Sequence, residues 1–480
     1  MCVKNEFFQK LKNDGEVLGI SPFYASCERV IVGFSGGADS SLLLSYFVYL
    51  RDTEKNFPEV TALHVNHMLR GDEADGDEAF CRSRCAELKV PLDVVRADVP
   101  ALMTETGLGA EECARNVRYE AFLNAAKMCG SSIIATAHNA DDNLETVLFN
   151  LTRGGGTSGL SGIPPIRDGY IVRPLLTLGG AEIRRACEDM NIPYVVDSTN
   201  SHEEYTRNFM RHSVVPKLRR VNPDVSAASV RAGMILREDE EFFRSLAADA
   251  IGEYLPRSGF ADSVEIPRAV LSRLPLPVMS RAVMMAVAAV TNVRAGAEHI
   301  RLCRRLVTES GTGKVTLPDK TVFEVARELV IVERCPTEAK EFFVPLELPK
   351  YGECLRFSSA EGGFDLYLSR NIESLPEHDE NIYKLSINTA LRFDTIYGKV
   401  FARSRCAGDV LFLGGHRRRL KKMIAERGIP ESRRSRLPVI CDDEGVLAVP
   451  GLPVRGPAYA RECDFEENVL YLRYCLYWRI

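Results

Sequence analysis

Short apolar runs alternate with longer stretches of helical spacing over residues 29–215 of this 480-residue chain. The short runs are rich in β-branched residues, as buried strands are, and the longer stretches repeat apolar residues every three or four positions. This alternation predicts an α/β fold with a doubly wound parallel sheet covered by helices on both faces. Strands are expected at 29–34, 60–65, 91–96, 132–136 and 170–172, with 194–196 as a candidate last strand, and helices at 39–51, 73–88, 110–129, 141–152 and 179–190.

The pattern changes after Pro223. Two long stretches of helical spacing follow, at about 225–254 and 268–309. Residues 313–334 then read as two short strands around a turn at 318–320. A helical middle domain with a small attached sheet is the simplest interpretation. The rest of the chain is strand-rich and predicts a small α+β C-terminal domain. We expect domains at 1–218, 219–340 and 396–480, with a mixed connecting segment at 341–395.

The C-terminal part combines short strands with a strongly basic stretch that we expect to be a helix. A further strand is expected to run into a turn at 446–452. Clustered arginines and lysines indicate a site for RNA phosphates, although a solvated helix face explains such a run equally well when it is taken alone. The cluster contains Arg417, Arg418, Arg419, Lys421 and Lys422, followed by Arg427, Arg433, Arg434 and Arg436.

A glycine-containing hexapeptide follows the first expected strand and precedes the first expected helix. Glycines let the backbone approach a ligand, and free N–H groups at a helix N-terminus bind phosphate oxygens. A Walker loop would carry a lysine, whereas this loop carries Asp39, and a carboxylate beside polyphosphate indicates a bridging Mg²⁺. The strand-to-helix context favours a nucleotide loop over a plain glycine turn. The loop consists of Ser35, Gly36, Gly37, Ala38, Asp39 and Ser40.

Polar clusters also follow the second and fourth expected strands, at the sheet edge where α/β proteins bind ligands. We expect His64 to pack within its strand and His67 and Arg70 to lie among ligands. A metal site at the histidines would need a third ligand, which is missing nearby. His138 precedes two adjacent carboxylates, those of Asp141 and Asp142. One of them can cap the next helix, and the other could hold Mg²⁺ or accept a proton.

Two pairs of arginines are spaced so that each pair shares one helix face. Arg115 and Arg118 are three residues apart, and Arg207 and Arg211 are four apart. Such pairs suit the clamping of phosphate or RNA.

Composition narrows the class of protein. Apolar residues make up 45% of the chain and charged residues 26%, which describes a folded protein of two to four domains. A net charge of −5 argues against coating nucleic acid over the whole surface. The 14 cysteines are scattered, which predicts reduced, buried thiols. No apolar run is long enough for a membrane span and no signal pattern opens the chain, so we expect a cytoplasmic protein.

Taken together, the motifs resemble the tRNA(Ile)-lysidine synthetase family of the N-type ATP pyrophosphatases, the PP-loop enzymes that cleave ATP between its α- and β-phosphates. The resemblance is close over 30–218 and returns at 408–439, which is similar to the C-terminal domain of the longer members. It rests on the hexapeptide, His64–Arg70, Ala114-Arg115 with Arg118-Tyr119, His138 with Asp141-Asp142 and Glu145-Thr146, Arg153–Gly156, Arg173–Leu176, Asp197–Asn200 and Arg207–Arg211.

The resemblance implies a two-step reaction on the wobble cytidine of an isoleucine tRNA with a CAU anticodon. The cytosine 2-oxygen attacks the ATP α-phosphorus, pyrophosphate leaves, and the ε-amine of free L-lysine then displaces AMP. ATP and Mg²⁺ are the implied cofactors, and the tRNA and lysine are the implied partners. The oligomeric state stays open, with a homodimer as one option.

The family's site residues carry over to matching positions. The loop at 35–40 and His67 would bind ATP, with Asp39 as the Mg²⁺ contact. The implied catalytic residues are Asp39, Arg115, His138, Asp142 and Arg207, without a division into acid, base and clamp. The implied RNA contacts are Arg70, Arg118, Arg211, Arg417, Arg418, Arg419, Lys421 and Lys422.

Two other functions are weighed against this one. A tRNA thiolase of the same superfamily would commonly carry paired cysteines near its core, and this chain has no such pair. A non-catalytic tRNA-binding protein would not need the intact Asp39, the paired carboxylates or the arginines.

Overall fold

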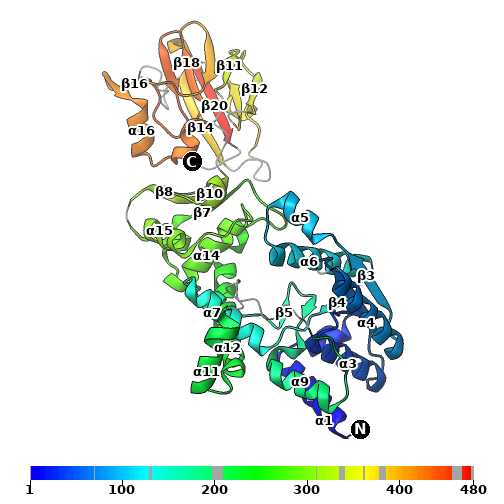
Figure 1. Ribbon diagram of the computed structural model, residues 1–480. Coiled ribbons are helices and arrows are strands. Elements are labelled where there is room, and N and C mark those ends of the chain that lie inside the picture. The colour runs from blue at the N-terminus through cyan, green and yellow to red at the C-terminus, as the bar shows by residue number, and fades with distance from the viewer. Residues whose placement is uncertain are drawn as a thin grey trace. The chain divides into compact units, whose positions relative to one another are not determined.

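The computed structural model describes residues 2–69, 71–128, 132–196, 209–309, 311–334, 341–360, 363–377, 385–456 and 468–476. Arg70, Arg207 and the motif at 197–200 lie outside these ranges. The chain divides into two compact units, Met1–Glu241 and Phe242–Ile480, each described by itself below (Figure 1). The expected boundaries at 218, 340 and 395 stay a prediction. No helix among the described residues is both long enough and apolar enough to cross a membrane.

The first unit is built on a six-stranded sheet in the order β3-β2-β1-β4-β6-β5. All neighbours pair in parallel except β5, which is antiparallel to β6. The strand order reverses between β1 and β4, the point where doubly wound sheets bind ligands. The predicted α/β fold is therefore confirmed. The strands are β1 (Arg29–Gly33), β2 (Glu59–Asn66), β3 (Leu92–Arg96), β4 (Ser132–Ala135), β5 (Ile166–Arg167) and β6 (Ile171–Val172).

Helices cover both faces of this sheet. Alternate residues of β1 face opposite ways: Val30 and Val32 join a core with α1, α3 and α9, and Ile31 joins a core with Phe122 of α6. The helices of this unit are α1 (Cys2–Val17), α2 (Ser21–Ala25), α3 (Ala38–Thr53), α4 (Asp72–Leu88), α5 (Val99–Thr106), α6 (Ala110–Met128), α7 (Ala140–Thr152), α8 (Thr157–Leu160), η1 (Pro174–Thr177), α9 (Gly180–Asp189), η3 (Met210–Val214) and α11 (Val215–Val221). The chain passes from the first unit into the second within α12 (Val225–Ile251).

Five of the six expected strands and all five expected helices of this unit are found. The sixth expected strand, 194–196, is wrong, because this segment runs as irregular chain beside the nucleotide loop, where the Val195 N–H donates to the Gly36 carbonyl at 2.9 Å. The helices α1, α2, α5, α8 and α11 and the short strand β5 were not predicted from the sequence.

The second unit begins with a four-stranded sheet, β7-β10-β9-β8, which packs with helices around one core. The expected hairpin at 318–320 joins β8 to β9. The expected helical stretch at 268–309 is found as three helices, because Pro275 and Gly296 stand as N-caps of the second and third. The elements are η4 (Gly252–Tyr254), β7 (Ser263–Pro267), α13 (Arg268–Ser272), α14 (Leu276–Ala288), α15 (Ala297–Thr308), β8 (Gly313–Thr316), η5 (Pro318–Lys320), β9 (Thr321–Val325) and β10 (Leu329–Arg334).

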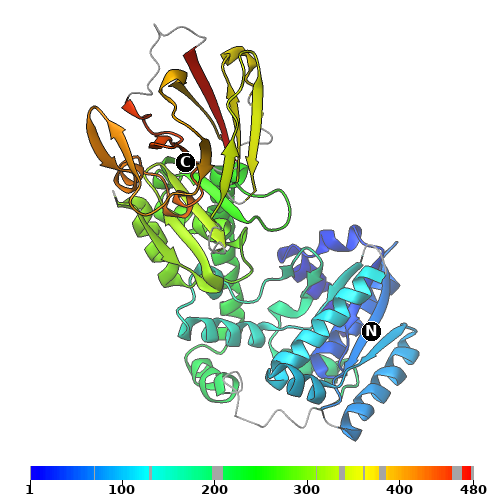
Figure 2. The same cartoon turned by 90° about the horizontal axis from the view of Figure 1, so that it is seen from above.

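Two further four-stranded sheets, β11-β15-β18-β19 and β12-β13-β20-β14, share one core in the C-terminal part (Figure 2). The expected basic helix is partly wrong, because Arg417–Arg419 lie in a strand and the helix begins only at Leu420. The elements are β11 (Phe343–Leu346), β12 (Cys354–Ser359), β13 (Phe364–Ser369), η6 (Ile372–Ser374), β14 (Leu385–Arg392), η7 (Phe393–Thr395), β15 (Val400–Arg403), β16 (Val410–Leu413), β17 (His416–Arg419), α16 (Leu420–Glu426), α17 (Glu431–Arg434), β18 (Val439–Asp442), β19 (Gly445–Ala448) and β20 (Val469–Leu476).

Candidate active site

The hexapeptide forms the turn between β1 and α3. Gly37 is the N-cap of α3, and no side chain caps the helix there. The loop hydroxyls bond to the loop itself: Ser40 Oγ accepts from the Ser35 N–H at 3.2 Å and donates to the Gly37 carbonyl at 3.0 Å. The uncapped N–H groups of the first turn of α3 are therefore available to an anion such as phosphate.

Gly36 cannot be replaced without strain in this loop. Its φ angle is +88°, in the region that favours glycine, and a Cβ atom there would lie 3.2 Å from the Phe80 ring and 3.4 Å from Cys81 Sγ. The sequence requirement for glycine thus follows from the backbone and from the helix α4 packed beneath it.

Asp39 lies in the first turn of α3, beside the end of β4. Asn139 Nδ2 donates to Asp39 Oδ2 at 3.2 Å. Burial, and then the nearby carboxylate of Asp142, raise the pKa of Asp39 to about 6, against the opposing effect of Arg184 and the Asn139 hydrogen bond. A desolvated carboxylate near another carboxylate is stabilised by a cation.

The residues after β4 form the N-terminus of α7. Asn139 caps the helix by accepting from the N–H groups of Asp141 (2.9 Å) and Asp142 (3.1 Å), and Asp142 Oδ2 accepts from the Asn139 N–H in return. Half-buried His138 lies beside this cap, with its Nδ1 3.0 Å from Thr136 Oγ1. This capping box holds His138, Asp142 and Asp39 at one sheet edge.

The two adjacent carboxylates have different surroundings. Asp141 accepts from the Gly180 N–H at 3.0 Å and from Arg219 Nη2 at 2.7 Å, so it joins α7 to α9 and α11. Asp142 Oδ2 accepts the hydrogen bond from the Asn139 N–H in the helix cap, and Asp142 Oδ1 lies 3.3 Å from Arg211 Nη2.

Glu145 is a buried carboxylate that the sequence reasoning included in a motif but did not select as a site residue. It is 1% exposed and pairs with Arg211, whose Nε lies 2.6 Å from Oε1. Its spacing of three residues from Asp142 places both on one face of α7, which is a signal the sequence did contain. Arg211, expected to contact RNA, lies in the π-helical turn η3 and faces these two carboxylates.

A cationic group lies on the other side of the same edge, at the end of β2 and the start of α6. Burial, then Arg118, then His64, lower the pKa of His67 to about 4, so this histidine is neutral at pH 7. Arg115 stacks over the Tyr119 ring, with 5.0 Å from its Cζ to the ring centroid. His64 is buried, with Nδ1 2.9 Å from the Phe34 carbonyl, as expected of a packed strand residue.

The basic cluster of the second unit divides into two groups. Arg417, Arg418, Arg419, Lys421 and Lys422 are exposed. Arg433 instead is 2% exposed and pairs with Glu265 at 2.9 Å and Glu333 at 3.1 Å. The prediction that Arg433 belongs to an RNA-binding cluster is wrong, because its side chain is buried and its two charge partners are largely buried as well.

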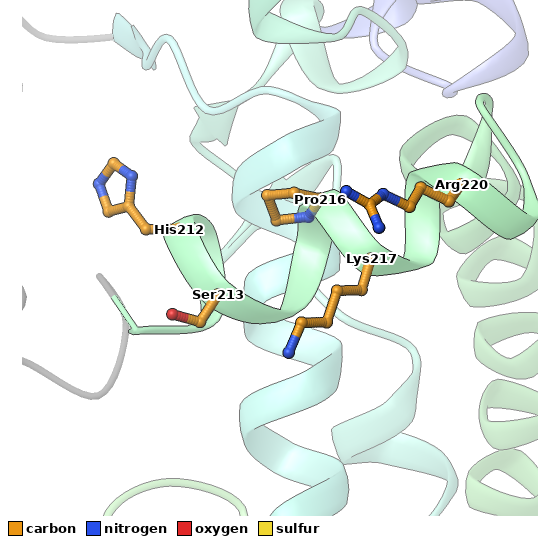
Figure 3. Close-up of a pocket in the computed structure, with 5 residues that line it drawn as sticks. All are labelled: His212, Ser213, Pro216, Lys217 and Arg220. Carbon is orange, nitrogen blue, oxygen red and sulfur yellow. The ribbon is translucent and has the colours of Figure 1, made fainter.

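A separate pocket of about 330 Å³ lies at η3 and α11 (Figure 3). Two cationic side chains line it together with polar groups, which favours an anion over a cation. The lining residues are His212, Ser213, Pro216, Lys217 and Arg220. Within the described ranges, no group of three or more His, Cys, Asp or Glu side chains is placed to hold a metal ion by itself.

Comparisons with known proteins agree with this geometry. Residues 5–218 match the family model described as a PP-loop domain, and residues 400–464 match the one described as a TilS substrate C-terminal domain. The first unit is thus a PP-loop nucleotide-binding protein in class.

Similar curated proteins narrow the class further. The chain is 32% identical over 450 residues to tRNA(Ile)-lysidine synthase from Geobacillus kaustophilus, covering 88% of this chain and 90% of the relative. It is 29% identical to that of Bacillus subtilis (88% and 89% covered) and 29% identical to that of Thermotoga maritima (88% and 91% covered). The chain belongs to the tRNA(Ile)-lysidine synthase family.

Proposed function

We propose that this protein joins free L-lysine to carbon 2 of the wobble cytidine in an isoleucine tRNA with a CAU anticodon. ATP is consumed and released as AMP and pyrophosphate. The observation that carries the proposal is the placement of a lysine-free phosphate loop and a group of carboxylates at one switch point of the sheet, in a chain of this family.

The loop geometry supports attack at the α-phosphorus. The uncapped N–H groups at the start of α3 would stabilise the negative charge that develops on a departing pyrophosphate bound in the loop. The cytosine 2-oxygen forms the new P–O bond as the bond to pyrophosphate breaks. In the second step the lysine amine forms a C–N bond at carbon 2, and the C–O bond to AMP breaks.

The carboxylate side of the site supports binding and deprotonation of the amine. Asp142 and Glu145 share one face of α7, and His138 lies beside them. An ammonium group would be attracted by these acids, and it must lose a proton before it attacks. We assign Asp142 and His138 as the groups within reach of that proton, while Arg211 positions the two carboxylates.

Asp39 fits the role of a magnesium ligand. Mg²⁺ is usually held by one or two carboxylates together with substrate phosphates, so a single carboxylate beside the loop is sufficient. The raised pKa of Asp39 reflects a charge that a cation would stabilise. When bound, Mg²⁺ supplies neutralisation of the developing phosphate charge.

The thiolase alternative is weakened by the state of the thiols near the loop. Cys81 and Cys187 lie beside the loop, and burial raises the pKa of both, that of Cys187 to about 12. A sulfur relay needs thiolates at neutral pH, and these thiols stay protonated.

The products of ATP cleavage test the proposal. With purified protein, lysine and a CAU tRNA, we expect AMP and pyrophosphate in equal amounts, and neither product without the tRNA. An Asp39→Asn variant serves as the matched control. Release of ADP and phosphate, or tRNA-independent cleavage, would contradict the assignment.

A further inference from the structure

Two guanidinium groups lie close to the ring of Tyr119, a residue of α6. The Arg115 Cζ is 5.0 Å from the ring centroid, and the Arg167 Cζ, from β5, is 5.1 Å from it. The chain thus brings an arginine from each of two elements, far apart in sequence, onto one aromatic ring.

A third guanidinium, that of Arg173, is buried beside the Tyr119 hydroxyl. Arg173 follows β6 directly and is 3% exposed. Its Nη1 donates to the Pro164 carbonyl at 2.5 Å. The Arg173 guanidinium and the Tyr119 hydroxyl interact with each other, and among the described residues the Arg173 Nε has no acceptor.

The charges around this group do not balance. No ion pair joins Arg115 or Arg173 to a carboxylate among the described residues, and Arg167 pairs only with its exposed neighbour Asp168 at 3.0 Å. Burial by itself would raise the pKa of Tyr119, but the charge of Arg115, the charge and hydrogen bond of Arg173 and the charge of Arg167 together hold that pKa below its ordinary value, as expected where positive charge is in excess. A buried arginine without a carboxylate partner is costly unless an anion completes it.

We propose that Arg115, Tyr119, Arg167 and Arg173 form a binding site for an oxyanion, and that its ligand is a backbone phosphate of the RNA substrate. The proposal rests on the proposed function for the identity of that RNA. The Arg173 Nε–H, which has no acceptor among the described residues, and the Tyr119 O–H can donate hydrogen bonds to the oxyanion, and the three guanidiniums provide charge.

Openness of the site favours RNA over a small anion. Arg115 and Arg167 are both exposed, so the rim of the site is reached from the surface, while the Tyr119 hydroxyl and the Arg173 Nε lie buried beneath that rim. Arginine beside an aromatic ring is a common setting for nucleic-acid phosphate and base contacts. The α-carboxylate of lysine shares the oxyanion chemistry and is the second source to be distinguished.

The test uses full-length Arg167→Gln and Tyr119→Phe proteins and measures tRNA affinity over a range of salt concentrations. Removing the Arg167 charge should weaken binding about tenfold. It should also flatten the slope of log affinity against log salt by about 0.7 to 0.9, the value for one neutralised phosphate. Tyr119→Phe removes a hydroxyl but no cation, so it should weaken binding and leave the slope unchanged.

An exposed arginine of α9 provides the control. Arg185→Gln removes the same charge from the same unit and should leave both affinity and slope within error. Thermal unfolding of each variant would identify loss of folding, and Arg173→Lys would extend the series into the buried position.

Three outcomes overturn the proposal in distinct ways. An unchanged slope in Arg167→Gln with an unchanged Michaelis constant for lysine would remove the site altogether. An unchanged slope with a raised Michaelis constant for lysine would reject RNA and assign the anion to the amino acid. A slope equally flattened in Arg185→Gln would mean a general charge effect. Because tRNA binding requires no lysidine formation, failure of the proposed reaction would be seen separately.

Discussion

Asp39 is a carboxylate that the fold makes costly to ionise. Its pKa in the folded protein, about 6, exceeds the ordinary value of 3.8 mainly because of burial and Asp142. Between those two pH values the unfolded chain loses its proton first, so this residue lowers stability as pH rises through the window. Above pH 6 the full cost is at most about 3 kcal/mol.

Asp39→Asn should therefore stabilise the ligand-free protein while abolishing its activity. Asparagine keeps an oxygen that can accept from Asn139, and it removes the charge. We expect a higher melting temperature than wild type at pH 7.5, no difference at pH 4, and no tRNA-dependent ATP–pyrophosphate exchange. A variant less stable than wild type at pH 7.5 would refute this account of Asp39.

Arg211 is a second residue whose surroundings suggest a specific experiment. Its removal leaves buried Glu145 without one of its charged partners, so Arg211→Met should lower the free energy of unfolding by about 1 to 3 kcal/mol. Adding Glu145→Gln should recover part of that loss, which a double-mutant cycle in urea measures. Additive effects would show that the pair does not interact.

Among the elements, the turn from β1 to α3 depends most strictly on its residue types. Gly36→Ala should lose at least about 1 kcal/mol of stability, because of the +88° φ angle and the contact with Phe80, and should weaken ATP binding. Gly76→Ala is the matched control, since Gly76 lies within α4 with open space around it and should gain up to about 1 kcal/mol. Chemical denaturation of both proteins checks the difference, and equal effects would contradict it.

The elements that the sequence predicted well are those in which apolar residues recur at a regular spacing. Strand β1 and helix α3 follow from an apolar run, a glycine turn and a buried helix face. The error at 194–196 has a tertiary cause: the backbone pairs with Gly36 of the nucleotide loop instead of with a strand. Arg417–Arg419 form a strand because they pair with β16, a pairing that no local pattern reveals.

The candidate site was predicted through residue types more than through their contacts. Asp39, His138 and Asp142 are brought together as the sheet topology implies. The roles of Asn139, which joins two helix N-termini, and of Glu145 depend on distances between α3, α7 and η3. The individual catalytic, ATP-binding and RNA-binding assignments stay predictions.

At the scale of the whole molecule, different arginines of the basic cluster in the second unit are expected to contribute to RNA binding and to stability. Replacing Arg417, Arg418 and Arg419 with glutamine should weaken tRNA binding and flatten its salt dependence, by about 0.7 to 0.9 for each phosphate that is no longer neutralised, at unchanged melting temperature. Arg433→Met should instead lower the free energy of unfolding by about 3 to 5 kcal/mol, because Glu265 and Glu333 lose their partner. An unchanged salt slope in the triple variant would assign the exposed arginines to a solvated surface.

The central claim is that this protein transfers lysine to a cytidine in tRNA at the expense of ATP. The most direct measurement supplies labelled lysine and, separately, labelled sulfur donor to the full-length protein with ATP and a CAU tRNA. We predict one lysine incorporated per tRNA, dependent on ATP and on Asp39, and no sulfur. Incorporation of sulfur, or ATP-dependent tRNA binding without any incorporation of lysine, would contradict the account.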